Sequence, residues 1–136
     1  MADLAGTETH AQLLAAFARK SEVNRRYLWF AQQADIEGRP QAAALFRSLA
    51  ESETGHAHGH LEFLADVADP TSGLPIGDTD DNLAASLSAE TVDAELYASI
   101  ARTARAEGFG PIADWCDSVA EADAAHVERL TAERSP

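Results

Sequence analysis

Two short motifs combine a carboxylate with a histidine three residues later in the chain. They are Glu53-Thr-Gly-His56 and Asp123-Ala-Ala-His126. Residues at positions i and i+3 of a helix lie on the same face, so the two side chains of each motif can bind one metal ion together. One such motif is a weak signal, because acidic residues and histidines are common on solvated helix faces. Two of them in one chain indicate a metal centre.

An internal repeat relates the two motifs, because His56 and His126 lie 70 positions apart. The same offset, without a gap, pairs further identical residues: Tyr27 with Tyr97, Ser48 with Ser118 and Glu51 with Glu121. Such pairs favour a duplicated helical hairpin with approximate two-fold symmetry. The alternative, a coincidence of register between two amphipathic hairpins in an alanine-rich chain, stays open.

Helical periodicity and the positions of proline and glycine predict an all-α chain. The four expected helices run from about Thr9 to Ile36, from Pro40 to about Val67, from a cap at Asp80 or Asp81 to Glu107, and from the Gly108–Pro111 turn to near Glu133. The first and last connections are short, which predicts two antiparallel helix pairs. No segment has the alternating pattern of a strand.

The middle connection, Ala68 to Asp80, has about 13 residues and holds two prolines and two glycines. When extended it reaches about 43 Å, whereas a helix of about 25 residues is about 38 Å long. It can therefore return along the helices and start the third helix at the opposite end. This length predicts a ferritin-like four-helix bundle with one long crossover between helices 2 and 3, formed by residues 1–136 as a single domain.

Net charge and cysteine content exclude several classes of protein. The 10 lysines and arginines against 23 aspartates and glutamates give a net charge of −13, so neither nucleic acid nor a membrane surface is expected as a partner. No apolar stretch approaches the roughly 18 residues of a membrane span, and the first residues lack a signal-peptide pattern, so we expect a cytoplasmic protein. The single cysteine, Cys116, excludes disulfide frameworks and four-cysteine metal centres within the chain.

Four parts of the chain carry a family resemblance: Ala16-Phe-Ala18 with Asn24-Arg-Arg-Tyr27, Ala44-Leu-Phe46 with the segment 50–57, the segment 101–109, and Ala120-Glu-Ala-Asp123-Ala-Ala-His126. Through these residues the sequence from about Leu13 to Leu130 resembles the ferritin-like domain of rubrerythrins. Rubrerythrins are non-haem di-iron proteins that reduce hydrogen peroxide with electrons from a rubredoxin-type centre. The resemblance implies metal ligands at Glu53, His56, Glu90, Asp123 and His126. It also implies that Tyr27 and Tyr97 lie beside the metals, where they would orient carboxylates during catalysis.

Position 20 departs from the rubrerythrin pattern. Where the family has a glutamate ligand on the first helix, this chain has Lys20, and the 70-residue offset pairs this position with Glu90. An ammonium at a ligand position repels a metal cation. We therefore predict that Lys20 forms an ion pair with Glu53, Glu90 or Asp123 when metal is absent. A Lys20 side chain that extends to solvent is the alternative.

Asp93 decides how many metal ions the ligand set can balance. It follows Glu90 by three residues, but it precedes Tyr97 by four residues where the family pattern has five. With Asp93, four carboxylates balance the charge of two divalent ions. If Asp93 points away from the site, a single ion is expected. Mixed carboxylate and imidazole ligands favour iron, with manganese as the other candidate, over calcium.

These features predict a di-iron oxidoreductase that reduces hydrogen peroxide or reacts with dioxygen, in protection against oxidative stress. Because no rubredoxin domain is recognised in the chain, a separate electron-donor protein is expected. The alternatives are a protein that binds metal without redox turnover and a degenerate, metal-free bundle closed by an ion pair of Lys20. The resemblance implies a homodimer, and the length of the segment Asp69–Asp80 permits either exchange of hairpins between subunits or a return within one chain.

Overall fold

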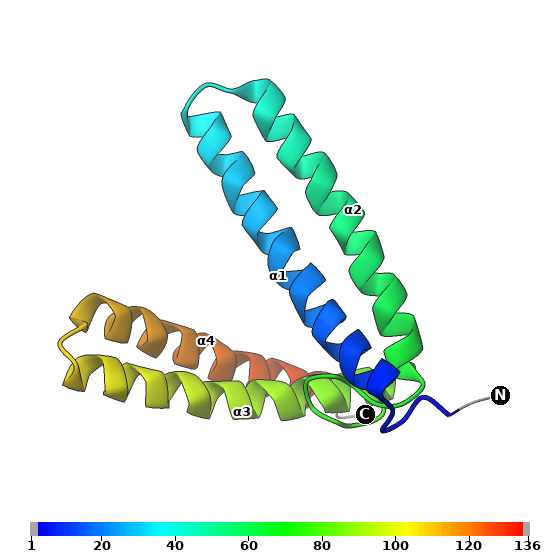
Figure 1. Ribbon diagram of the computed structural model, residues 1–136. Helices are drawn as coiled ribbons and strands as arrows, with labels where there is room; N and C mark the ends of the chain where they lie inside the picture. Colours follow the sequence, from blue (N-terminus) through cyan, green and yellow to red (C-terminus); the bar gives the residue numbers. More distant parts are fainter. Residues whose placement is uncertain (1–2, 135–136) are drawn as a thin grey trace. The chain divides into compact units, whose positions relative to one another are not determined.

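Residues 3–134, which the computed structural model describes, form four long helices (Figure 1). The helices are α1 (Glu8–Ile36), α2 (Pro40–Ala65), α3 (Thr79–Ala106) and α4 (Gly110–Arg134). This part of the chain contains no strand, so the predicted all-α class is confirmed. Among the same residues, no helix combines enough length with enough hydropathy to span a lipid bilayer.

The start of α3 differs from the prediction, which placed the cap at Asp80 or Asp81. The N-cap is Asp78, whose Oδ1 accepts a hydrogen bond from the backbone N–H of Asp81 at 2.8 Å. Asp80 and Asp81 therefore lie inside the first turn, where a negative charge interacts favourably with the helix dipole. The N–H of Gly77 donates to Oδ1 of Asn82 at 2.8 Å, which ties the preceding turn to the helix and selects the earlier cap.

The described chain divides into two compact helical hairpins, one up to Val67 and the other from Ala68 onward. In the first, α1 packs against α2, and in the second, α3 packs against α4 (Figure 1). The antiparallel pairs predicted from the short turns are confirmed. The prediction that residues 1–136 act as a single domain stays a prediction.

Small side chains at regular spacing hold the helices of each hairpin together. The buried residues of α2 recur every seven positions, at Ala43, Ala50, Ala57 and Leu64. A seven-residue spacing keeps one face of a helix turned toward its neighbour. Alanine at that face allows the two helix axes to approach closely. Ala113, which lies 70 positions after Ala43, is also fully buried, so the second hairpin uses the same contact.

The turns of the two hairpins have the same geometry. In each, a glycine with positive φ follows the first helix, Gly38 at 71° and Gly108 at 88°. The residue after each glycine donates its N–H to a carbonyl of the preceding helix, that of Ala34 at 2.8 Å and that of Ala104 at 2.7 Å. Only glycine adopts this left-handed conformation without a steric penalty.

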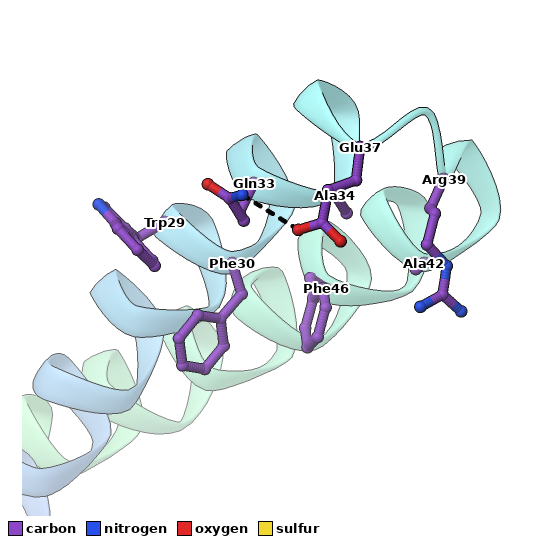
Figure 2. Close-up of a pocket in the computed structure, with 8 residues that line it drawn as sticks. All are labelled: Trp29, Phe30, Gln33, Ala34, Glu37, Arg39, Ala42 and Phe46. Atoms are coloured by element: carbon purple, nitrogen blue, oxygen red, sulfur yellow. Dashed lines mark hydrogen bonds between the residues drawn. The ribbon is translucent and has the colours of Figure 1, made fainter.

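A small pocket borders each turn. The pocket of the first hairpin has a volume of about 220 Å³, and Figure 2 shows its lining residues, including the hydrogen bond from Gln33 to Glu37 at 3.0 Å. The pocket of the second hairpin has a volume of about 310 Å³ and is lined by Ser99, Ile100, Thr103, Ala104, Glu107, Phe109 and Ile112. Each of these residues lies 70 positions after a residue of the first pocket.

An ion pair joins the helices of each hairpin close to its turn, with the charges exchanged. Asp35 of α1 pairs with Arg47 of α2. At the positions 70 residues later, Arg105 of α3 pairs with Asp117 of α4 at 2.9 Å. An ion pair therefore occurs at equivalent positions of both hairpins, although the acidic and basic residues are exchanged. Such a correspondence is not expected between unrelated hairpins. The structure therefore favours a duplicated hairpin over a coincidence of register.

We expect overpacking of the alanine contact to destabilise both hairpins to a similar extent. Ala43→Leu and Ala113→Leu each add a bulky side chain at a fully buried position. Each should lower the free energy of unfolding by about 1–3 kcal/mol, because the paired helices must move apart. Chemical denaturation followed by circular dichroism measures the change. Ala44→Leu, at an exposed position of the same helix, is the matched control and should change stability by less than about 0.5 kcal/mol. Equal effects at positions 43 and 44 would contradict this packing.

Candidate metal centre

The second hairpin brings three candidate ligands together. Glu90 of α3 and Asp123 and His126 of α4 each offer one ligand atom, and these atoms all lie within 4.8 Å of one another. Nδ1 of His126 is 3.3 Å from Oε2 of Glu90 and 3.7 Å from Oδ1 of Asp123. Two carboxylates and one imidazole are a donor set that iron or manganese can use. We call these three residues the α3–α4 group.

Asp123 is buried at a cost that a cation would offset. The whole residue is 9% exposed and its side chain 13% exposed, and it is the one charged residue of the core among residues 3–134. Its carboxylate forms no hydrogen bond within this part of the chain, and its nearest ionisable partner is the His126 imidazole, with Nδ1 3.7 Å from Oδ1. A buried carboxylate without hydrogen bonds is destabilising unless a positive charge compensates it. The α3–α4 group therefore fits a divalent cation.

The α3–α4 group opens onto a pocket of about 460 Å³. Glu90 and His126 line this pocket together with Arg129 and Glu133, one and two turns further along α4. The pocket gives a small molecule access to the candidate ligands. The sequence analysis did not single out Arg129, although its position three residues after His126 places it on the same helix face.

In the first hairpin, a lysine occupies the place next to the equivalent carboxylate–histidine motif. Lys20 of α1 places Nζ 2.6 Å from Oε2 of Glu53 on α2. Nδ1 of His56 lies 3.4 Å from Oε1 of the same carboxylate. The predicted ion pair of Lys20 is confirmed, with Glu53 as its partner. We call Lys20, Glu53 and His56 the α1–α2 group.

Lys20 is the close partner of a buried oxygen atom. Oε2 of Glu53 is inaccessible to solvent and accepts no well-aligned hydrogen bond within the described chain. The neighbouring Lys20 ammonium holds the pKa of Glu53 below its ordinary value; burial opposes this effect, and His56 adds a smaller lowering. With Lys20 in this position, the α1–α2 group does not fit a second cation.

The two groups therefore differ in charge at repeat-related positions. Position 20 corresponds to 90, position 53 to 123, and position 56 to 126. With neutral histidines, Lys20 and Glu53 have no net charge, whereas Glu90 and Asp123 carry two negative charges. The difference arises from the lysine alone, because both motifs keep their carboxylate and histidine.

Three other predicted site residues lie outside these groups. Asp93 is half-buried on α3 and is not a member of the α3–α4 group. Tyr27 is half-buried and stacks on Phe46, with ring centroids 6.1 Å apart. Tyr97 packs against the core of the second hairpin around Cys116. The roles of Asp93, Tyr27 and Tyr97 stay predictions.

Asn24 is a positioning residue that the sequence analysis missed. Its side-chain amide donates to the carbonyl oxygen of Ala50 and to Oγ1 of Thr54, both at 2.7 Å. These bonds fix α1 against α2 beside Glu53. Asn24 lies four residues after Lys20, on the same face of α1. The four-residue spacing from Lys20 could have pointed to Asn24. The hydrogen-bond partners of Asn24, however, lie on another helix and cannot be read from that spacing.

Comparison with known proteins identifies the family. The Rubrerythrin family model matches residues 12–75. The chain is 37% identical to a rubrerythrin of Porphyromonas gingivalis, over 93% of this chain and 66% of that protein. It is also 37% identical to a rubrerythrin of Nitratidesulfovibrio vulgaris, over 96% of this chain and 71% of that protein. Rubrerythrin-1 of Clostridium acetobutylicum is 33% identical, over 97% of this chain and 72% of that protein.

The chain thus spans between 66% and 72% of the length of these relatives. The aligned region spans both hairpins and the positions of both carboxylate–histidine motifs, since at least 93% of the chain is aligned. The predicted ferritin-like helical fold is the fold of this family. The chain belongs to the rubrerythrin family of non-haem di-iron proteins.

Proposed function

We propose that this chain is a non-haem iron oxidoreductase that reduces hydrogen peroxide or reacts with dioxygen, in protection against oxidative stress. The observation that carries this proposal is the α3–α4 group, in which two carboxylates and an imidazole converge beside an open pocket. Membership of the rubrerythrin family supports iron as the metal and peroxide as the oxidant.

The residues of the second hairpin suit this reaction. Glu90, Asp123 and His126 would hold the metal, with the two carboxylates balancing its charge. Iron held by these residues would supply electrons and act as a Lewis acid toward an oxygen substrate. Arg129 places a positive charge in the pocket beside Glu90 and His126, where it can orient a small, polar or anionic oxygen species. Tyr27 and Tyr97 are proposed to orient carboxylates, in line with the resemblance.

Electrons must reach the centre from outside it. Reduction of one hydrogen peroxide to two waters consumes two electrons and two protons. Cys116 is the one cysteine of the chain and is buried, so these residues cannot build a four-thiolate iron centre. We propose a separate electron-donor protein as a partner.

Peroxidase activity tests the proposed function. The iron-loaded protein should reduce hydrogen peroxide with an artificial reductant faster than the same concentration of free iron. Asp123→Asn and His126→Ala should each lower this rate by about tenfold or more, because each removes a donor from the group. Glu121→Gln, at an exposed position of the same helix, is the control and should leave the rate unchanged. A rate equal to that of free iron would contradict the oxidoreductase and leave a protein that binds metal without turnover.

We also propose that the protein is a homodimer. Each hairpin exposes large apolar side chains, among them Trp29 at 63% and Trp115 at 67%. A dimer would bury such side chains, and contiguous apolar patches on a surface are typical of an interface. Light scattering should give a mass of about twice 14.5 kDa. Trp115→Glu should shift the mass toward that of one chain, and a wild-type mass near 14.5 kDa would reject the dimer. Exchange of hairpins between copies stays a prediction.

A further inference from the structure

Lys20 makes the two repeat-related ligand groups unequal. We propose that the α3–α4 group binds the first divalent transition-metal ion tightly, while the Lys20 ammonium serves as the resident cation of the α1–α2 group. A second ion would then bind Glu53 and His56 only by displacing Lys20. This inference rests on the proposed metal centre, but it does not require redox turnover.

The contacts of Glu53 show why a second ion is disfavoured. Nζ of Lys20 is 2.6 Å from Oε2, and this oxygen is closed to solvent. Within the described chain no well-aligned hydrogen bond replaces the ammonium there. A metal ion that binds Oε2 must therefore separate a close ion pair. It must also approach a positive charge, which repels it unless the lysine moves away.

Lys20 is able to move. Its side chain is 37% exposed, and the four-carbon stem has several rotatable bonds, so the ammonium can turn toward solvent. Glu53 and His56 would then present the same carboxylate–histidine pair as Asp123 and His126. The structure therefore assigns Lys20 to a competitive role and does not exclude the second ion.

The α3–α4 group has no ion-paired cation to displace, although Arg129 lines its pocket. Its ligand atoms lie within 4.8 Å of one another. Donors held about 2.1 Å from one metal ion are at most about 4.2 Å apart, so small side-chain rotations complete the site. The Asp123 side chain is 13% exposed and forms no hydrogen bond in residues 3–134, which adds to its attraction for a cation. No lysine or arginine within residues 3–134 forms an ion pair with Glu90 or Asp123.

Equilibrium dialysis of the full chain against Mn²⁺, with the metal quantified, tests this inference without reference to activity. The wild type should bind one ion per chain tightly and a second at least about tenfold more weakly. Lys20→Met should tighten the second ion by about tenfold, since it removes the competing charge. Lys20→Glu should bring the two affinities within about tenfold of each other, since it adds a carboxylate at the position equivalent to Glu90.

The matched control is Arg19→Glu, which makes the same change of charge at an exposed neighbouring position and should leave the second affinity unchanged. Two further variants assign the tight ion to a hairpin. His126→Ala should abolish it, and His56→Ala should leave it in place. These two variants keep the inference testable if the Lys20 variants fail to fold.

The inference is overturned if the wild type binds two ions with equal affinity, or if His56→Ala removes the tight ion. It is also overturned if folded Lys20→Glu binds the second ion as weakly as the wild type. A protein that binds one tight ion but shows no peroxidase activity would support the inference and contradict the proposed function.

Discussion

The close contact between the paired helices of each hairpin determines where the candidate ligands lie. Ala43, Ala50 and Ala57 are buried at seven-residue intervals, so the face of α2 that they define is fixed against α1. The residue three positions after Ala50 lies on that face, and it is Glu53. Asp123 lies on the corresponding face of α4, seven residues after the buried Cys116. The spacing that packs each hairpin therefore also carries a carboxylate into it.

A carboxylate in a helix contact needs a positive partner, because its burial removes it from water. The first hairpin provides one within the chain, since Lys20 reaches Glu53 from α1. In the second hairpin the equivalent position holds Glu90, so a second negative charge faces Asp123 where a positive one would be expected. In both hairpins the charged groups make the helix contact less stable than an apolar contact would be. Charged groups in such places are typical of functional sites. The buried carboxylate is thus neutralised by a lysine in the first hairpin, and we propose that a metal ion neutralises it in the second.

Much of this could be predicted from the sequence, because the signals are local. The helix ends follow from Gly38, Pro40 and Gly108, and the shared face of each ligand motif follows from its i, i+3 spacing. The partner of Lys20 could not be selected among three carboxylates, because the first helix of a four-helix bundle has more than one neighbour and the direction of a long side chain depends on packing. Asn24 was missed for the same reason, since its hydrogen-bond partners lie 26 and 30 residues away on α2. The place of Asp93 also depends on packing that its spacing alone does not determine.

The central claim is that the lysine and the metal ion play equivalent electrostatic roles in the two hairpins. The most direct measurement is anomalous diffraction from crystals of the full chain grown with one equivalent of Mn²⁺. We expect one anomalous peak per chain among Glu90, Asp123 and His126, with Nζ of Lys20 still in contact with Glu53. A peak of equal height between Glu53 and His56, with Lys20 turned away from Glu53, would contradict it.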